Sequence, residues 1–286
     1  LGKLLPKYAD EDLAFNFREF FRVNADGQFI HEHDVRSFLN LISKKDDENN
    51  YPYSTEEYRN NFRHSLWMVP GVKEARALSA MLKKHPVFSQ FTIVNVAGEG
   101  DEEEANEDAL KKVQNAIGEH PEETYTITLS CGRLTMGVSV PAWTAVFMLA
   151  GSYNTSATSY MQTIFRVQTP AEINGRVKEE CFVFDFAPDR TLRVIAETAK
   201  ISAKAGKTSM SDRETMGEFL NFCPIIAIEG SRMKTYNVNG MLEQLKKVYV
   251  ERVVRNGFED GYLYNNDHLM QLEEVELKDF DGLKRI

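Results

Sequence analysis

Cysteine and long apolar runs are both scarce in this sequence of 286 residues. Its three cysteines, Cys131, Cys181 and Cys223, lie far apart in apolar stretches and match neither a zinc-binding spacing nor a disulfide framework, which indicates a reducing cytoplasm. No apolar run reaches the roughly 20 residues that a membrane-spanning helix needs. No secretory pattern follows Leu1, so we expect a cytoplasmic fragment of a larger protein, with no membrane partner.

Signatures of catalysis within a single chain are missing as well. No serine–histidine–acid order stands out, and none of the six histidines has an obvious metal partner. Residues 205–208 (AGKT) imitate the end of a Walker A loop, but Ile201 stands where that motif needs another glycine. Residues 97–100 follow an apolar run, but the acids after their glycines would repel a phosphate. We therefore expect no metal site here and no activity of this chain alone.

The net charge of −9 argues only weakly against a nucleic-acid partner. Much of the acid lies in two runs, residues 44–48 and 99–104, which are typical of solvated loops. Basic clusters at residues 111–112 and 200–207 could still form a positive track, so the charge does not decide the matter.

Strand patterns alternate with helix patterns between residues 62 and 199. We predict strands at residues 65–69, 91–96, 181–186 and at both ends of 126–149, and helices at 72–84, 106–117 and 158–165. Such alternation predicts an α/β domain, a doubly wound parallel sheet covered by helices on both faces. Trp143 and Phe147 are expected in its core or at a domain interface rather than as platforms for base stacking.

The flanking regions are predicted to be helical. Residues 1–61 form a helical segment and linker, in which four phenylalanines share a helix: Phe15, Phe17, Phe20 and Phe21. His31 and His33 suggest a metal site, but residues two apart do not share a helix face, and Asp34 near a helix N-cap is the better interpretation. After Ala199 we expect no further strand, and residues 200–286 form a mostly helical C-terminal extension.

A polar loop separates the two core strands of residues 126–149 (TITLSCGRLTMGVSVPAWTAVFML), and it resembles a helicase motif. CGRLTMGVSVP, residues 131–141, resembles motif V of superfamily two helicases and translocases, which closes on Gly-(Ile/Val)-Asp-x-Pro. SYMQTIFRVQ, residues 159–168, resembles motif VI, Gln/His-x-x-Gly-Arg-x-x-Arg. LWMVPG, residues 66–71, precedes a helix and stands where motif IV belongs. The three motifs come in the family's order, and the resemblance covers residues 62–199.

This resemblance implies a second RecA-like domain, most similar in style to the helicase part of restriction-modification enzymes. In such motors ATP lies between two RecA-like domains, and the first of them supplies most of the ATP and Mg²⁺ ligands. The implied partners are therefore DNA and a first RecA-like domain of the same polypeptide, with attached nuclease or methyltransferase modules left open.

The resemblance also assigns roles to single residues. Arg166 would face the transferred phosphoryl group and Gln162 would orient nucleotide or water. Gly137 would allow close approach at the interdomain cleft, and Ser139, at the usual aspartate position, would bond a ribose hydroxyl. The DNA backbone would meet residues of motifs IV and V. These are Pro70, Gly71, Val72, Arg133 and Thr135.

Three departures from the motifs leave alternatives open. Phe165 replaces the glycine of motif VI, Thr169 replaces its last arginine, and Ser139 replaces the acid of motif V. Either Arg166 acts alone, or Arg176 substitutes for the second arginine, or the motor is impaired. The rival interpretation is a non-catalytic RecA-like interaction module that has lost its motor function. A third is an enzyme that binds nucleotide by itself.

Overall fold

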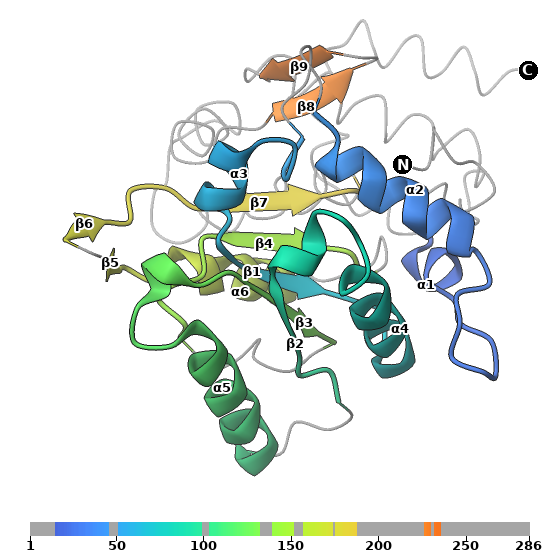
Figure 1. Ribbon diagram of the computed structural model, residues 1–286, viewed down its shortest axis with the longest axis horizontal. Coiled ribbons are helices and arrows are strands. Elements are labelled where there is room, and N and C mark those ends of the chain that lie inside the picture. The colour runs from blue at the N-terminus through green and yellow to red at the C-terminus, as the bar shows by residue number, and fades with distance from the viewer. Residues whose placement is uncertain are drawn as a thin grey trace, which may run out of the picture. The chain divides into compact units, whose positions relative to one another are not determined.

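A five-stranded parallel sheet forms the centre of the chain (Figure 1). The computed structural model describes residues 15–45, 51–98, 103–131, 139–151, 157–173, 175–187, 226–229 and 232–235. The strands of the sheet are β1 (His64–Met68), β2 (Thr92–Asn95), β3 (Thr126–Ser130), β4 (Ala145–Met148) and β7 (Phe182–Asp185). Their order across the sheet is β2-β3-β1-β4-β7, which places the fully buried β1 in the middle.

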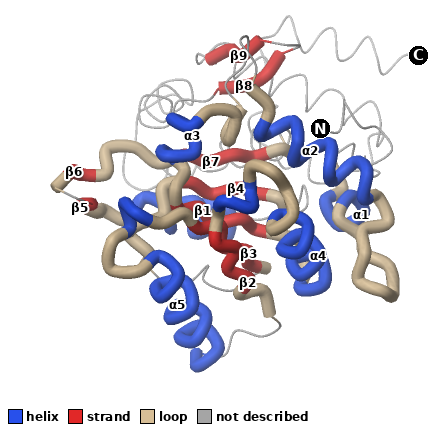
Figure 2. The backbone as a smooth tube through the Cα atoms, viewed as in Figure 1, coloured by secondary structure: helices blue, strands red, loops and turns tan. Residues whose placement is uncertain are grey.

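Helices cover both faces of this sheet (Figure 2). One face packs against three helices, α1 (Phe17–Phe20), α2 (Glu32–Ser43) and α4 (Val72–Leu82). The opposite face packs against α5 (Glu103–Ile117) and α6 (Ala157–Ile164). A further short helix, α3 (Glu56–Asn61), precedes β1 and is capped by the Thr55 hydroxyl, which accepts the amide of Tyr58 at 3.1 Å. The predicted α/β class, a parallel sheet with flanking helices, is confirmed.

Side-chain alternation along the strands explains the two layers. Successive residues of a strand point to opposite faces, so a strand covered on both sides contributes alternate side chains to two separate layers of the core. In β1 and β4, Trp67 and Phe147 face the α4 side, while their neighbours Leu66 and Val146 face the α5 and α6 side. Trp143 and Phe147, expected in the core, are both fully buried.

The N-terminal segment shares the core of the sheet. Tyr53 is completely buried, and its ring lies 5.0 to 6.1 Å from five aromatic neighbours, Phe62, Trp67, Phe88, Phe91 and Phe147. Its hydroxyl lies 3.0 Å from the Ser65 Oγ, which also accepts the Trp67 indole N–H at 3.1 Å. Burial raises the pKa of Tyr53 well above its usual range, so the phenol stays neutral.

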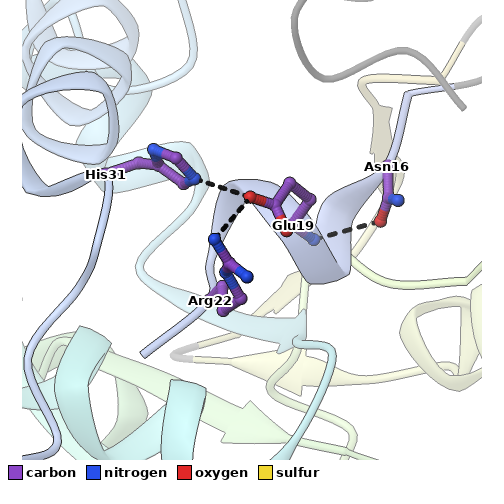
Figure 3. A network of polar contacts seen from close by, with 4 residues as sticks. All are labelled: Asn16, Glu19, Arg22 and His31. Carbon is purple, nitrogen blue, oxygen red and sulfur yellow. Dashed lines mark hydrogen bonds and ion pairs between the residues drawn. The ribbon is translucent and has the colours of Figure 1, made fainter. Parts of the chain in front are cut away.

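A polar network holds the start of this segment (Figure 3). The Asn16 side chain accepts the amide of Glu19 at 3.0 Å and so caps α1. The carboxylate of Glu19 lies 2.8 Å from the His31 Nε2 and 3.1 Å from an Arg22 nitrogen. His31 therefore joins α1 to the start of α2, and the metal interpretation of His31 and His33 has no support among the described residues, where no group of metal-ligating side chains occurs.

Two hairpins were not predicted. The expectation of no strand after Ala199 was wrong, because β8 (Ile226–Glu229) and β9 (Arg232–Thr235) form an antiparallel pair there. Another short pair, β5 (Glu172–Ile173) and β6 (Arg176–Val177), follows α6. The chain divides into two compact units, residues 1–237 and 238–286, and the second unit lies outside the described residues. No helix of the described part is long and apolar enough to cross a membrane.

His64, at the start of β1, makes the stability of the fold pH-dependent. Its buried Nε2–H donates to the Pro121 carbonyl at 2.7 Å, and its Nδ1 accepts the Thr126 hydroxyl at 2.9 Å. Burial lowers the pKa of His64 to about 4, below its usual 6.5. The unfolded chain therefore binds a proton that the folded chain does not, and stability falls as the pH drops from 6.5 towards 4.

We expect this histidine to remove about 2 kcal/mol of the free energy of unfolding between pH 7 and pH 5. Urea denaturation of the wild-type chain and of His64→Gln at both pH values measures the effect, because the variant lacks the titrating group. His33→Gln, at an exposed position, is the control and should keep the wild-type dependence. Equal pH dependence in His64→Gln and the wild type would contradict the prediction.

Candidate functional site

The predicted site residues fall at opposite edges of the sheet. Pro70, Gly71 and Val72 follow the carboxyl end of β1, whereas Ser139 precedes β4 and Arg166 follows α6. Of the predicted site residues, Arg133, Thr135 and Gly137 lie in residues 132–138, which are outside the described part of the chain. The two edges are therefore considered in turn.

At the carboxyl edge, three neighbouring strands end together. The amide of Val69 donates to the Ser130 carbonyl at 2.8 Å, and the amide of Leu149 donates to the Met68 carbonyl at 2.9 Å. The chain leaves β1 for α4 on one face and leaves the adjacent β4 for α6 on the other. Neighbouring strands whose connections depart to opposite faces define a switch point, where doubly wound sheets bind ligands.

The N-terminus of α4 lies at this switch point. Gly71 is its N-cap residue and has an extended backbone. A glycine has no side chain that could accept hydrogen bonds from the first amides of the helix. The Glu74 side chain folds back over Gly71, and its carboxylate occupies the space that a Cβ at position 71 would need. A carboxylate near a helix N-terminus is favourable, since the helix dipole is positive there. A phosphate arriving at Gly71 and Val72 would compete with this carboxylate.

At the amino edge, α6 continues directly into the 3-10 helix η4 (Phe165–Gln168). Gln162 is exposed and precedes the half-buried Arg166 by four residues, a spacing that places both on the same side of a helix. Thr169 stands where motif VI has its last arginine, and its hydroxyl donates to the Arg166 carbonyl at 3.3 Å. Phe165 is 49% exposed, so its side chain replaces the motif glycine without displacing the core.

Ser139 is exposed and lies just before a tight turn into β4. The turn is closed by the Trp143 amide, which donates to the Val140 carbonyl at 3.1 Å, and both of these residues are buried. The turn thus fixes where the predicted motif V returns to the sheet.

Lys178 joins this turn to the end of η4. Its Nζ donates to the carbonyls of Pro141 at 2.9 Å, Trp143 at 3.1 Å and Val167 at 2.9 Å. Burial lowers the pKa of the ammonium from its usual value. The last residue of the predicted motif V, Pro141, and the next-to-last of motif VI, Val167, are consequently bonded to one side chain, although 26 positions separate them in the sequence.

Sequence reasoning missed Lys178. It precedes Glu179 and Glu180 in a polar stretch, a context typical of a solvated surface charge. Its partners are main-chain carbonyls, which every residue carries, so no spacing of side chains could have revealed them.

No protein-family model matches the chain. Over 216 residues it is 32% identical to a Mycoplasma pneumoniae protein described as the C-terminus of RM.MpnORF110P, a candidate type II restriction enzyme and methyltransferase. The match covers 72% of this chain and 28% of that protein, so the chain spans just over a quarter of the relative's length. Most of the chain is thus similar to part of a restriction-modification protein.

Two solved structures have folds that are partly similar to that of this chain. The ATP-dependent Type ISP restriction-modification enzyme LlaBIII bound to DNA gives a TM-score of 0.42 at 16% identity, covering 81% of this chain and 15% of that one. The C-terminal part of the Fun30 ATPase domain gives 0.35 at 9% identity, covering 87% and 62%.

Proposed function

We propose that the chain is the second RecA-like domain of an ATP-dependent DNA helicase or translocase from a restriction-modification system. The observation that carries this proposal is that the Lys178 ammonium bonds the carbonyl of Pro141, two residues after Ser139, and the carbonyl of Val167, the residue after Arg166. The predicted motif IV turn, at the opposite edge, follows the central strand at the switch point. The similarity to a restriction-modification protein supports the biological setting.

In this function ATP and Mg²⁺ are held mainly by a first RecA-like domain, and this chain completes the site. Arg166 neutralises negative charge on the phosphoryl oxygens, a role that needs a guanidinium presented at the domain surface. Gln162, one helical turn earlier, orients nucleotide or water from the same side. Ser139 offers an exposed hydroxyl to the ribose, and Gly137 allows the close approach of the nucleotide.

DNA is proposed to follow the carboxyl edge. Its phosphates would meet the main chain of Pro70, Gly71 and Val72 at the N-terminus of α4, together with Arg133 and Thr135 from the motif V loop. Amides and short side chains of this kind position a backbone without reading base sequence.

The decisive experiment uses the complete polypeptide that contains this chain. Its upstream sequence should hold a Walker A loop and an Asp-Glu-x-His/Asp box, and the purified protein should hydrolyse ATP faster when DNA is added. Isothermal titration of this chain alone with ATP should show no tight binding, because most of the ligands lie elsewhere. A complete polypeptide without those upstream motifs or without DNA-stimulated turnover would remove the proposal.

A second function, a non-catalytic interaction module, is favoured by two departures from the helicase pattern. Thr169 bonds the end of η4 where an arginine is expected, and Ser139 stands in the place of an acid. The same upstream sequence separates the two functions, because a module would lack the Walker A loop and the acidic box.

Removing the carboxylate that covers α4 tests the DNA-binding edge. We expect Glu74→Gln to tighten binding of a short DNA duplex by this chain about 2- to 5-fold, since a competing charge leaves the helix N-terminus. Fluorescence anisotropy at constant salt measures the change. Glu57→Gln, at an exposed position on α3, is the control and should leave affinity unchanged. Equal affinity of Glu74→Gln and the wild type would mean that DNA does not approach α4.

A further inference from the structure

Lys178 is carried by a short, well-defined hairpin. β5 and β6 pair Glu172 with Val177 and Ile173 with Arg176, and Gly175 adopts a φ of +72° in the turn between them. The amide of Lys178 then donates to the Ala171 carbonyl at 2.8 Å and closes the hairpin. The hairpin therefore fixes the main chain of Lys178 ten residues beyond the end of η4.

The ammonium of Lys178 uses its full bonding capacity on the main chain. A lysine ammonium has three donors and no acceptor, and here three carbonyl oxygens, of Pro141, Trp143 and Val167, lie within 3.1 Å of it. No salt bridge of Lys178 with a carboxylate occurs among the described residues. An exposed ion pair would leave the ammonium free to move, whereas three converging carbonyls define one position for it.

The three acceptors flank the proposed nucleotide-facing residues. Pro141 follows Ser139 by two residues, and Val167 directly follows Arg166. Val167 also lies in the last turn of η4, where carbonyls lack helical partners and a cation is favourable. A single side chain thus bonds main-chain carbonyls at the end of the helix that carries Arg166 and in the turn that follows Ser139.

We propose that Lys178 is a positioning residue that holds the Ser139 segment and the Arg166 segment at a fixed separation. The role of this separation in ATP hydrolysis rests on the function proposed above, but the tie between the segments does not. The residue acts through the main chain and touches no substrate. Phosphoryl transfer depends on placement, and a displacement of about 1 Å can lower its rate about 100-fold.

Two variants separate geometry from charge. Lys178→Met keeps the length of the side chain and removes the donors and the charge. Lys178→Arg keeps the charge, but its planar guanidinium cannot direct three bonds to the same carbonyls. Lys84→Met, at an exposed position just after α4, is the matched control.

The first measurement is amide hydrogen exchange of this chain at residues 140–143 and 167–169. Both Lys178 variants should exchange faster there than the wild type, while the strands of the sheet keep their protection and Lys84→Met stays unchanged. Wild-type exchange in both segments of Lys178→Met would overturn the inference. This measurement needs no ATP, so it decides the tie even if the complete polypeptide proves to have no ATPase activity, a result that would sink only the proposed function.

The second measurement is DNA-stimulated ATP hydrolysis by the complete polypeptide. Both variants should lower kcat about 10- to 100-fold, with the KM for ATP changed less than about 3-fold, because alignment is lost and most binding contacts lie in the first domain. Faster exchange together with a wild-type kcat would overturn the positioning role. A wild-type kcat in Lys178→Arg alone would do so as well, since the charge would then suffice.

Discussion

Replacing Arg166 by alanine in the complete polypeptide should lower DNA-stimulated ATP hydrolysis by about 10³-fold or more. The guanidinium would no longer neutralise the charge on the transferred phosphoryl group, and no second motif VI arginine is present because Thr169 stands in its place. Steady-state turnover with saturating DNA measures the loss. Arg166 follows α6 at the edge of the sheet and is only half buried, so the variant should keep its fold and its thermal stability.

Two further variants make this result specific. Arg36→Ala removes a surface arginine whose ion pair with Glu32 lies within one helix, and it should hydrolyse ATP at the wild-type rate. Arg176→Ala tests the alternative that the exposed Arg176 of β6 supplies the missing charge. Unchanged turnover in Arg166→Ala, with a large loss in Arg176→Ala, would transfer the role to Arg176. Unchanged turnover in both would end the assignment of a phosphate-facing arginine to this chain.

The second large effect concerns stability. Tyr53→Ala should lower the free energy of unfolding by about 3–5 kcal/mol, the range found when large aromatic core residues are truncated. Its ring is completely buried among five aromatic side chains, and its hydroxyl lies beside the Ser65 and Trp67 polar atoms. Urea denaturation monitored by tryptophan fluorescence measures the loss, because Trp67 is one of those neighbours.

Tyr53→Phe separates the contribution of the hydroxyl from that of the ring, and Tyr58→Ala is the control for truncating a tyrosine outside the core. Tyr53→Phe keeps the ring and should cost about 1–2 kcal/mol, the expected effect of one missing buried hydrogen bond. Tyr58 is half buried on α3, so Tyr58→Ala should cost less than Tyr53→Ala. A loss for Tyr53→Ala no larger than that for Tyr58→Ala would contradict the central place given to Tyr53 in the core.

The secondary structure between residues 62 and 199 was largely predictable because its signals are local. The strands β1, β3 and β4 are buried at every residue, and the strand patterns stand out against the 3.6-residue period of helices such as α4 and α5. Two-residue strands such as β5 and β6 have no such signal, since a pair this short leaves no periodicity to detect. The β8–β9 hairpin was missed for a similar reason. Each of its strands is only four residues long, and a glycine such as Gly230 after a short apolar stretch is also typical of the end of a helix.

The candidate site divides in the same way. The quoted motifs predict which residues face a nucleotide or DNA, and those assignments stay predictions that the variants above can test. Two features that modify them were invisible in the pattern. The Glu74 carboxylate covers the N-terminus of α4. Lys178 bonds one segment just before β4 and another just after Arg166.

The amino-acid sequence by itself determined the α/β class, the order of the five sheet strands and of the helices α4, α5 and α6 between them, and the resemblance to helicase motifs, because each depends on neighbouring residues. Only the tertiary structure decided which segments meet. The turn before β4 and the end of η4 come together because α6 runs back along the sheet from the carboxyl end of β4. The contact is made by a lysine and three main-chain carbonyls, and carbonyls are the same at every position of every sequence.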